Sequence, residues 1–163
     1  QARVTELTQH YIQLASDIYQ EKFAPVEVRY DMSGTSVGMF RVDGKNSVIR
    51  YNPWLFAKYF EENLSGTVPH EVAHYIVHCL YGRRRLRPHG PEWLDVMQNF
   101  DADPTVTCDF DMTGIPQRKQ RRFDYTCGCR LHELSTRRHN NIQRRRHRYQ
   151  CVYCGDELRR KAL

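Results

Sequence analysis

The segment that most constrains this chain is residues 70–74, whose sequence is His-Glu-Val-Ala-His. Apolar residues surround it at helical spacing: Val68, Ala73, Ile76, Val77 and Leu80. This spacing predicts a buried amphipathic helix, with Thr67 as its N-cap, Pro69 in its first turn and Gly82 at its end. Two histidines and a glutamate that face inward on such a helix need polar or metal partners.

A single metal ion is the simplest partner for these side chains, because one ion can bind both histidines. Histidines four residues apart lie on one face of a helix, so His70 and His74 can bind one ion while Glu71 projects beside it. With a third protein ligand, one coordination position stays open for water, whose pKa zinc lowers towards neutrality. Because Glu71 can then take the proton, the pattern predicts a hydrolytic zinc site with Glu71 as the general base.

The third ligand is expected to be another histidine. His78 continues the series, but about 12 Å of helical rise separates it from His70, too far for a shared ion with bonds of ~2 Å. His89 follows the glycine turn, where the chain can fold back, and an apolar pattern from Trp93 to Phe100 predicts a second amphipathic helix directly after it. We therefore expect His89 to bind the metal and His78 to be structural.

The residues before this helix predict a small sheet with flanking helices. Apolar residues recur every three or four positions from residue 4 to residue 18, which predicts an opening helix. Residues 26–30, 37–42 and 47–51 alternate like strands and are separated by Ser-Gly and Asp-Gly turns. Asn52 and Pro53 suit a helix cap and first position, and predict a helix to about residue 62.

Charge is divided unevenly along the chain. Residues 1–116 hold 11 Lys and Arg against 15 Asp and Glu, whereas residues 117–163 hold 14 against 4. The net charge is therefore −4 in the first part and +10 in the second. A basic end of this size favours a polyanionic partner, most often nucleic acid, and a solvated basic face is the alternative. Between the two parts, residues 101–122 contain prolines and a glycine and are expected to form a linker.

Four of the six cysteines form two close pairs in the basic end: Cys127, Cys129, Cys151 and Cys154. Two pairs that flank a short insert are typical of a structural zinc site, which can hold together a segment with almost no core. Cys129 and His132 also have a two-residue gap, so the pattern leaves one ligand open between Cys127 and His132. Disulfides are the alternative, but the absence of a secretory signal favours a reducing compartment.

Two further expectations concern the rest of the composition. Cys79 and Cys108 lie outside the pairs and are expected to be core or partly buried thiols. No apolar run approaches the length of a membrane span, so no membrane partner is expected.

Tyrosines and arginines are interleaved through the basic end. They are Tyr125, Arg130, Arg137, Arg138, Arg144, Arg145, Arg146, Arg148, Tyr149 and Tyr153. Arginines bind phosphates and exposed aromatic rings stack on unpaired bases, so this pattern favours DNA single strands or duplex ends. The alternative for Tyr149 and Tyr153 is packing in a small core.

Several motifs together make this chain resemble the SprT family, the bacterial relatives of Spartan-type metalloproteases. They are Ile-Arg-Tyr-Asn-Pro at 49–53, Thr-Val-Pro-His-Glu-Val-Ala-His at 67–74, Pro-His-Gly-Pro-Glu-Trp at 88–93, Tyr-Thr-Cys-Gly-Cys at 125–129, Thr-Arg-Arg-His-Asn at 136–140 and Tyr-Gln-Cys-Val-Tyr-Cys at 149–154. The resemblance runs nearly from end to end. The tight spacing of Cys127 and Cys129 departs from the usual ribbon pattern.

The resemblance implies roles for these residues. His70, His74 and His89 would bind a catalytic zinc, Glu71 would be the base, and the C-terminal ribbon would bind a second zinc. It also implies a DNA-associated protease that cuts proteins bound or cross-linked to DNA, a substrate class that belongs to the Spartan relatives.

We therefore predict an α+β fold, with a zincin-like metalloprotease domain over residues 1–116 and a basic zinc-ribbon domain over residues 117–163. The predicted activity is a zinc metalloendopeptidase of the HExxH type, recruited or activated by DNA and acting on DNA-bound proteins in the bacterial cytoplasm, at the nucleoid. The cofactors are two zinc ions, one catalytic and one structural. The alternatives are a DNA-binding ribbon with a weak or latent protease site, and a zinc hydrolase of non-peptide amides.

Overall fold

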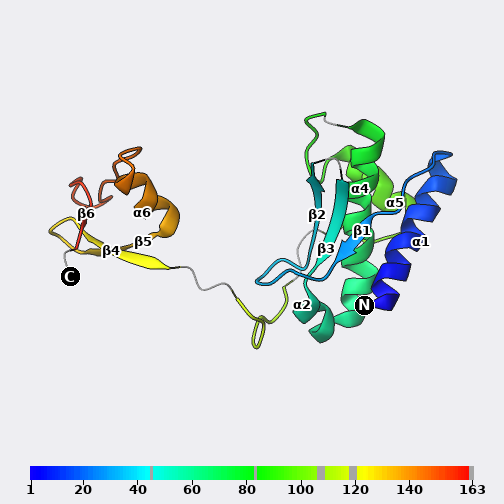
Figure 1. The fold of residues 1–163 in the computed structure, drawn as a ribbon, viewed down its shortest axis with the longest axis horizontal. Helices are drawn as coiled ribbons and strands as arrows, with labels where there is room; N and C mark the ends of the chain where they lie inside the picture. Colours follow the sequence, from blue (N-terminus) through cyan, green and yellow to red (C-terminus); the bar gives the residue numbers. More distant parts are fainter. Residues whose placement is uncertain (45, 83, 106–108, 118–120, 162–163) are drawn as a thin grey trace. The chain divides into compact units, whose positions relative to one another are not determined.

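The computed structural model describes residues 1–44, 46–82, 84–105, 109–117 and 121–161. The chain divides into two compact units, Gln1–Gln117 and Arg118–Leu163, which are shown in Figure 1 and described separately below. Both units combine helices with a small sheet, so the α+β class is confirmed.

The described residues of the first unit hold three strands and five α-helices, in the predicted order except that two short helices replace the one expected after Asn52. They are α1 (Ala2–Tyr19), β1 (Glu27–Arg29), β2 (Gly38–Asp43), β3 (Asn46–Tyr51), α2 (Pro53–Lys58), α3 (Phe60–Glu62), α4 (Val68–Tyr81) and α5 (Pro91–Asn99). A short π-helical turn, η1 (Asn63–Thr67), joins α3 to α4.

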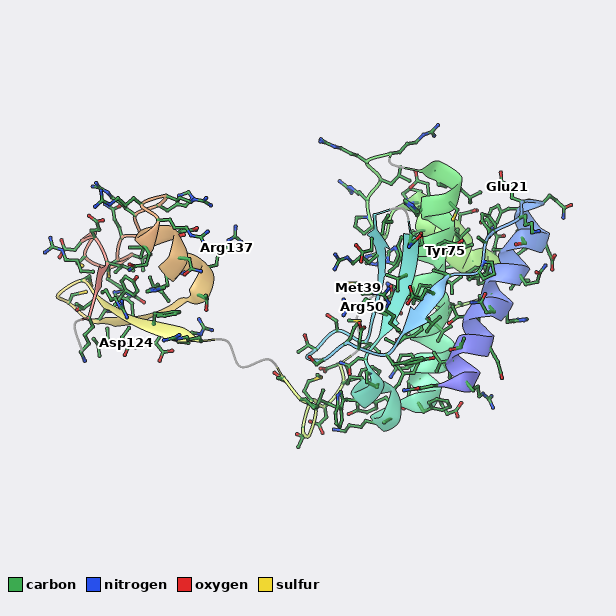
Figure 2. All side chains as sticks on the ribbon, viewed as in Figure 1. Glu21, Met39, Arg50, Tyr75, Asp124 and Arg137 are labelled. Carbon is green, nitrogen blue, oxygen red and sulfur yellow. The ribbon has the colours of Figure 1, made fainter. Side chains whose placement is uncertain are left out.

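The sheet of the first unit has the strand order β1-β3-β2, so β2 is an edge strand. β1 runs parallel to β3, and β2 pairs antiparallel with β3, which sets Met39 opposite Arg50 (Figure 2). Figure 1 shows α1, α4 and α5 gathered on one side of this sheet, and α4 packs against β2 and β3. The core between them is built mainly from large buried side chains: Tyr51, Ile49, Val68, Val72, Ile76, Trp93, Val96 and Met97.

The entry into α4 differs from the prediction. Asn52 caps α2 as expected, since its Oδ1 accepts from the N–H groups of Trp54 and Leu55. The predicted single helix is interrupted after Lys58, however, and the chain then runs through η1 directly into α4. Thr67 occupies the N-cap position of α4 as predicted, but its side chain makes no capping hydrogen bond, because its backbone angles are helical and its hydroxyl donates to Asn63 Oδ1 at 2.9 Å.

The expected linker over residues 101–122 is also wrong for much of its length. The structure fastens residues 109–116 to the first unit, with Phe110 stacked on Tyr59 and the Gly34 N–H donating to Pro116 O at 3.0 Å. At its other end, Arg122 already begins a strand of the second unit. Residues 109–116 are therefore held against the first unit rather than free. Cys108 lies outside the described residues.

The second unit is a three-stranded antiparallel sheet with one helix. Its elements are β4 (Arg122–Thr126), β5 (Leu131–Ser135), α6 (Thr136–Gln143) and β6 (Arg159–Arg160), with the strand order β5-β4-β6. Tyr125, Leu134 and Leu158 form its small core together with two cysteines. His139 is buried, stacks on Phe123 with ring centroids 3.7 Å apart and pairs with the Tyr125 hydroxyl at 3.0 Å.

The helix α6 was not predicted, because its sequence is rich in arginine and asparagine and shows only a short apolar pattern. Ser135 caps it by accepting from the Arg138 N–H. Among the described residues, no helix is long and apolar enough to cross a membrane.

Candidate metal centre and cleft

Three histidines of the first unit converge at the N-terminal half of α4. His70 and His74 lie one helical turn apart on α4, and His89 comes from the loop that precedes α5. The Nε2 atoms are 3.2 Å apart for His70 and His74, 3.1 Å for His74 and His89, and 3.2 Å for His89 and His70. The structure therefore brings together the three histidines that the sequence predicted as ligands.

This triangle of nitrogens fits a metal ion better than a set of hydrogen bonds. Three nitrogens bound to zinc at ~2.0–2.1 Å in tetrahedral directions lie about 3.3–3.4 Å from one another. A neutral imidazole has one N–H, and three Nε2 atoms facing one point cannot all donate to and accept from each other. The donor set, three imidazoles with room for a further ligand, is typical of catalytic rather than structural zinc.

The surroundings keep these imidazoles in the neutral form that binds metals. Burial lowers the pKa of His70 to about 4, with a further contribution from His89. Burial also lowers the pKa of His74 to about 3, assisted by the two neighbouring histidines. At neutral pH, the lone pairs of both rings are therefore free for a cation.

Glu71 lies on the same helix and is 6% exposed. Its Oε2 accepts a hydrogen bond of 2.6 Å from the Phe40 N–H on the edge strand β2. Burial raises the pKa of Glu71 from 4.5 to about 7, and the bond from Phe40 opposes this rise. A carboxylate with a pKa near neutrality is suited to exchange protons at physiological pH, and a cation held by the histidines would lower this value.

Gly38 is a residue of this site that the sequence analysis missed. A Cβ atom at this position would lie 2.7 Å from both Cγ and Oε1 of Glu71, and 2.9 Å from Cγ2 of Thr67. The absence of a side chain therefore lets β2 approach α4 closely enough for the Phe40 N–H to reach Glu71. No local pattern marks this glycine, because its partner lies 33 residues away.

The ring of Trp93 packs against the rings of the three histidines. It is 1% exposed, and its ring centroid lies 4.8 Å from those of His70 and His89 and 5.8 Å from that of His74. Its Nε1 also donates to the carbonyl oxygen of His70 at 3.3 Å. The sequence placed Trp93 on the apolar face of α5, and the structure adds that its ring packs against the three histidines.

His78 lies away from this centre, as predicted from the helical rise. Its ring packs beside that of Phe40 with centroids 5.6 Å apart, and it is not a member of the histidine group found among the described residues.

His70, His89 and Glu71 line a cleft of about 270 Å³. One wall is the backbone segment from Thr35 to Gly38, and the start of α4 with the preceding Gly66 and Thr67 also lines the cleft. Thr105, Phe110 and Met112 contribute a further part of the lining. Asn52 fixes the first wall, because its Nδ2 donates to the carbonyl oxygens of Gly34 and Ser36.

The second unit contains a separate sulfur cluster. The four predicted cysteines, Cys127, Cys129, Cys151 and Cys154, offer sulfur atoms within 4.8 Å of one another. The Cys129 and Cys151 sulfurs are 3.7 Å apart, close to the roughly 3.8 Å between thiolates bound to one tetrahedral zinc at ~2.3 Å. Four cysteines from two turns are the usual donor set of a structural zinc site, in which the protein fills all four coordination positions.

His132 lies beside this cluster. Its Nε2 lies 3.2 Å from the Cys127 sulfur. The Cys127 sulfur in turn lies 3.1 Å from the Cys129 sulfur. Burial raises the pKa of Cys127, but hydrogen bonds with Cys129 and His132 outweigh it and lower the pKa to about 5. A thiolate at Cys127 suits metal binding, with His132 as its hydrogen-bond donor.

The other cysteine whose position is described is Cys79, on α4. It is exposed, so the expectation that it is a core or partly buried thiol is wrong. It lies near the end of α4 between two half-buried residues, His78 and Leu80.

A basic concavity of about 660 Å³ lies on the second unit. It is lined by Arg122, Arg137, Arg138 and His147, together with Glu133, Ser135, Asn141 and Tyr149. The Arg138 guanidinium lies 5.6 Å from the centre of the Tyr149 ring, whose hydroxyl accepts from Asn141 at 3.1 Å. Tyr149 is half-buried against the small core, whereas Tyr153 is 71% exposed beneath Arg130.

Comparison with known proteins agrees with these features. The model of the SprT-like family matches residues 8–114, which contain the three histidines and Glu71. The chain belongs to the SprT-like family. The chain is 38% identical over 148 residues to Protein SprT of Actinobacillus succinogenes, and this match covers 90% of the chain and 83% of the relative.

Further SprT relatives match over similar lengths. Identity to Protein SprT of Pasteurella multocida is 38% over 148 residues, or 90% of the chain and 86% of the relative. Identity to Protein SprT of Serratia proteamaculans is 32% over 160 residues, or 98% of the chain and 90% of the relative. No solved structure matches the chain. The resemblance inferred from the motifs is thus confirmed at the level of the family.

Proposed function

We propose that this SprT-like protein is a zinc metalloendopeptidase that acts on proteins associated with or cross-linked to DNA. The observation that carries the proposal is the triangle of Nε2 atoms, 3.1–3.2 Å on each side, beside a buried Glu71 whose pKa is about 7. In this proposal the first unit is a zincin-like catalytic domain and the second is a basic zinc ribbon.

The residues of the first unit have distinct tasks in this reaction. His70, His74 and His89 would hold zinc, which when bound supplies a Lewis acid that polarises the peptide carbonyl and makes a water molecule more acidic. Glu71 takes a proton from water and delivers it to the leaving amine. Because the Phe40 N–H holds Oε2, the free oxygen that exchanges the proton is Oε1.

The second unit would hold the structural zinc on its four cysteines and would bind DNA. Its large positive charge and the arginine-lined concavity on α6 support a phosphate-binding role. The concavity also contains Tyr149, whose ring offers an aromatic surface to an unpaired base. DNA would then bring the enzyme and its protein substrates to one molecule, so the cleft itself needs little sequence selectivity.

The first experiment incubates the protein with a DNA-binding substrate protein, with and without DNA. We expect cleavage that DNA increases and that Glu71→Gln abolishes while zinc content is preserved, because the amide keeps the shape of the carboxylate but takes no proton. Ordinary turnover by Glu71→Gln would exclude Glu71 as the base.

The second experiment tests the DNA surface by reversing charge at Arg137 and Arg138. We expect weaker DNA affinity, a shallower dependence on salt concentration and loss of the DNA-dependent part of cleavage. Arg144, Arg145 and Arg146 are exposed after the end of α6. Charge reversal at these three residues should also weaken DNA affinity and reduce the DNA-dependent part of cleavage.

Cleavage of a short unstructured peptide separates two modes of DNA action. It should stay at the wild-type rate in the Arg137 and Arg138 variant and should not respond to DNA, if DNA acts by co-localisation. Stimulation of peptide cleavage by DNA would instead mean that DNA opens the cleft. Wild-type DNA affinity after both charge reversals would contradict the placement of the DNA surface on the second unit.

A further inference from the structure

One wall of the catalytic cleft is formed by a segment without helix or strand, residues 109–116, which we call the strap. Phe110 and Met112 of the strap line the same cleft as His70, Glu71 and His89. Both are partly buried, whereas Asp111 between them is exposed and points to α2. The strap therefore presents two large apolar side chains to the space where a substrate would lie.

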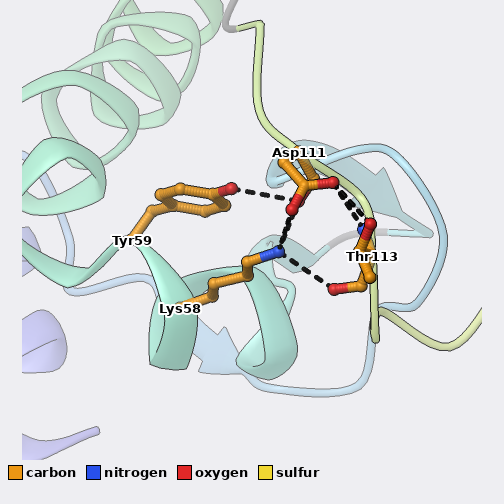
Figure 3. Close-up of polar contacts among 4 residues, drawn as sticks. All are labelled: Lys58, Tyr59, Asp111 and Thr113. Carbon is orange, nitrogen blue, oxygen red and sulfur yellow. Dashed lines mark hydrogen bonds and ion pairs between the residues drawn. The ribbon is translucent and has the colours of Figure 1, made fainter.

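Lys58 at the end of α2 fixes the middle of the strap (Figure 3). Its ammonium group has three N–H donors, and it is within hydrogen-bond distance of three acceptors. They are Asp111 O at 2.8 Å, Asp111 Oδ2 at 2.9 Å and Thr113 O at 2.9 Å. The other carboxylate oxygen of Asp111 accepts from the N–H and hydroxyl of Thr113, so the turn is held from both sides.

Tyr59 and Gly34 hold the strap at two further points. The Tyr59 hydroxyl donates to Asp111 O at 3.0 Å, and its ring stacks on Phe110 with centroids 4.2 Å apart and planes 10° apart. At the end of the strap, Pro116 O accepts from the N–H of Gly34, which directly precedes the cleft-lining segment from Thr35 to Gly38. Phe110 and Met112 are thus placed by contacts that involve no member of the metal centre.

We propose that Phe110 and Met112 form an apolar subsite for a substrate side chain next to the cleaved bond, and that Lys58 is the positioning residue for this subsite. The inference rests on the proposed peptidase function and adds a preference to it: peptides with a large apolar residue beside the scissile bond. Apolar surface on the strap gains contact with such a residue and gains little from glycine or aspartate.

Lys58 positions the strap but contributes little to the free energy of unfolding. The Lys58 side chain is 33% exposed and that of Asp111 is 64% exposed, and exposed ion pairs add little to the stability of a fold. Loss of the Lys58 ammonium removes three of the contacts between the strap and α2 and loosens the strap, but leaves the core, the histidines and Glu71 in place. We therefore expect Lys58→Met to raise KM for peptides while kcat at saturation and zinc content stay near wild type.

The test compares matched peptides that carry Leu, Gly or Asp beside the cleaved bond. Cleavage is followed by mass spectrometry with the wild type, Phe110→Ala, Met112→Ala, Met112→Lys, Lys58→Met and the control Lys22→Met, which changes an exposed lysine after α1. Peptide affinity is measured separately on the same variants in a non-cleaving Glu71→Gln background. Thermal unfolding identifies any variant that is damaged as a whole.

The wild type should favour the Leu peptide over the Asp peptide by roughly tenfold or more in kcat/KM, and the two alanine variants should lose most of this preference. Met112→Lys should shift the ranking of affinity and cleavage towards the Asp peptide, a gain that general damage does not produce. Lys22→Met should match the wild type.

Other outcomes separate the two proposals. Equal cleavage of all peptides by the wild type, or an unchanged ranking in Met112→Lys, would overturn the subsite and leave the peptidase function intact. A zinc-loaded wild type that cleaves no peptide or protein would overturn the peptidase function, and the subsite with it.

Discussion

The substitution Gly38→Ala tests how closely the edge strand and the catalytic helix approach. The new Cβ would lie 2.7 Å from Cγ and Oε1 of Glu71 and 2.9 Å from Cγ2 of Thr67, all closer than carbon contacts normally allow. Glu71 is buried and bound to the Phe40 N–H, so it moves only by giving up that hydrogen bond. The expected result is a displaced base in a protein that still folds.

Gly38→Ala should lower stability because the added methyl group overpacks the interior, and should lower activity because Glu71 is displaced. An extra methyl group in a filled interior typically costs about 1–3 kcal/mol, which for a unit of this size lowers the melting temperature by roughly 3–5 °C per kcal/mol. Displacement of a catalytic group by about 1 Å can reduce the rate on the order of a hundredfold. Zinc content should be unchanged, because the atoms nearest to the new Cβ belong to Glu71 and Thr67 and not to the three histidines.

Gly66→Ala is the matched control. Gly66 lines the same cleft and is also a glycine of the first unit, but a Cβ there meets no atom within 4 Å. Peptide kcat, melting temperature and zinc per chain are measured for both variants. If Gly38→Ala were as active and as stable as Gly66→Ala, the close approach of β2 to Glu71 would be wrong.

Three further predictions address the metals and Glu71. His89→Ala should remove zinc from the first unit whereas His78→Ala should not, and equal zinc loss would contradict the choice of third ligand. Cys154→Ser should release the second zinc and unfold the second unit, while His132→Ala should retain it, as zinc analysis and circular dichroism would show; release by His132→Ala would add His132 to the ligands. In metal-free protein the folded-state pKa of Glu71 is raised from 4.5 to about 7, so the folded state binds a proton that the unfolded state releases in this range. The wild type should therefore lose up to about 3 kcal/mol of stability relative to Glu71→Gln as the pH rises from about 5 to about 8, and parallel urea-unfolding curves would refute this.

The histidine triangle could be predicted from the sequence because its geometry is local. A four-residue spacing fixes His70 and His74 on one helix face, and the glycine turn after α4 returns His89 to them. The strand positions were also predictable, since β2 and β3 alternate and are joined by a turn. In these cases a short stretch of chain determines the contact.

The remaining parts of the site depend on contacts between distant residues. Gly38 faces Glu71 across 33 positions, and Lys58 reaches Asp111 across 53 positions. Neither contact has a periodic pattern, and the prolines near the strap favoured a linker because they exclude regular structure without showing where the backbone docks. The break after Lys58 likewise arises from packing, since Asn63 is buried and donates to Leu55 O.

A zinc titration of metal-free protein shows whether the histidine triangle and Glu71 form one hydrolytic centre. Zinc is added to the wild type, His70→Ala and Glu71→Gln while bound metal and peptide cleavage are both recorded. We expect the wild type to bind one equivalent of zinc that His70→Ala does not bind, and to begin cleaving as this equivalent binds. Glu71→Gln should bind the same equivalent without cleaving. Cleavage before this equivalent is bound, or cleavage by Glu71→Gln, would mean that the two parts do not form one centre.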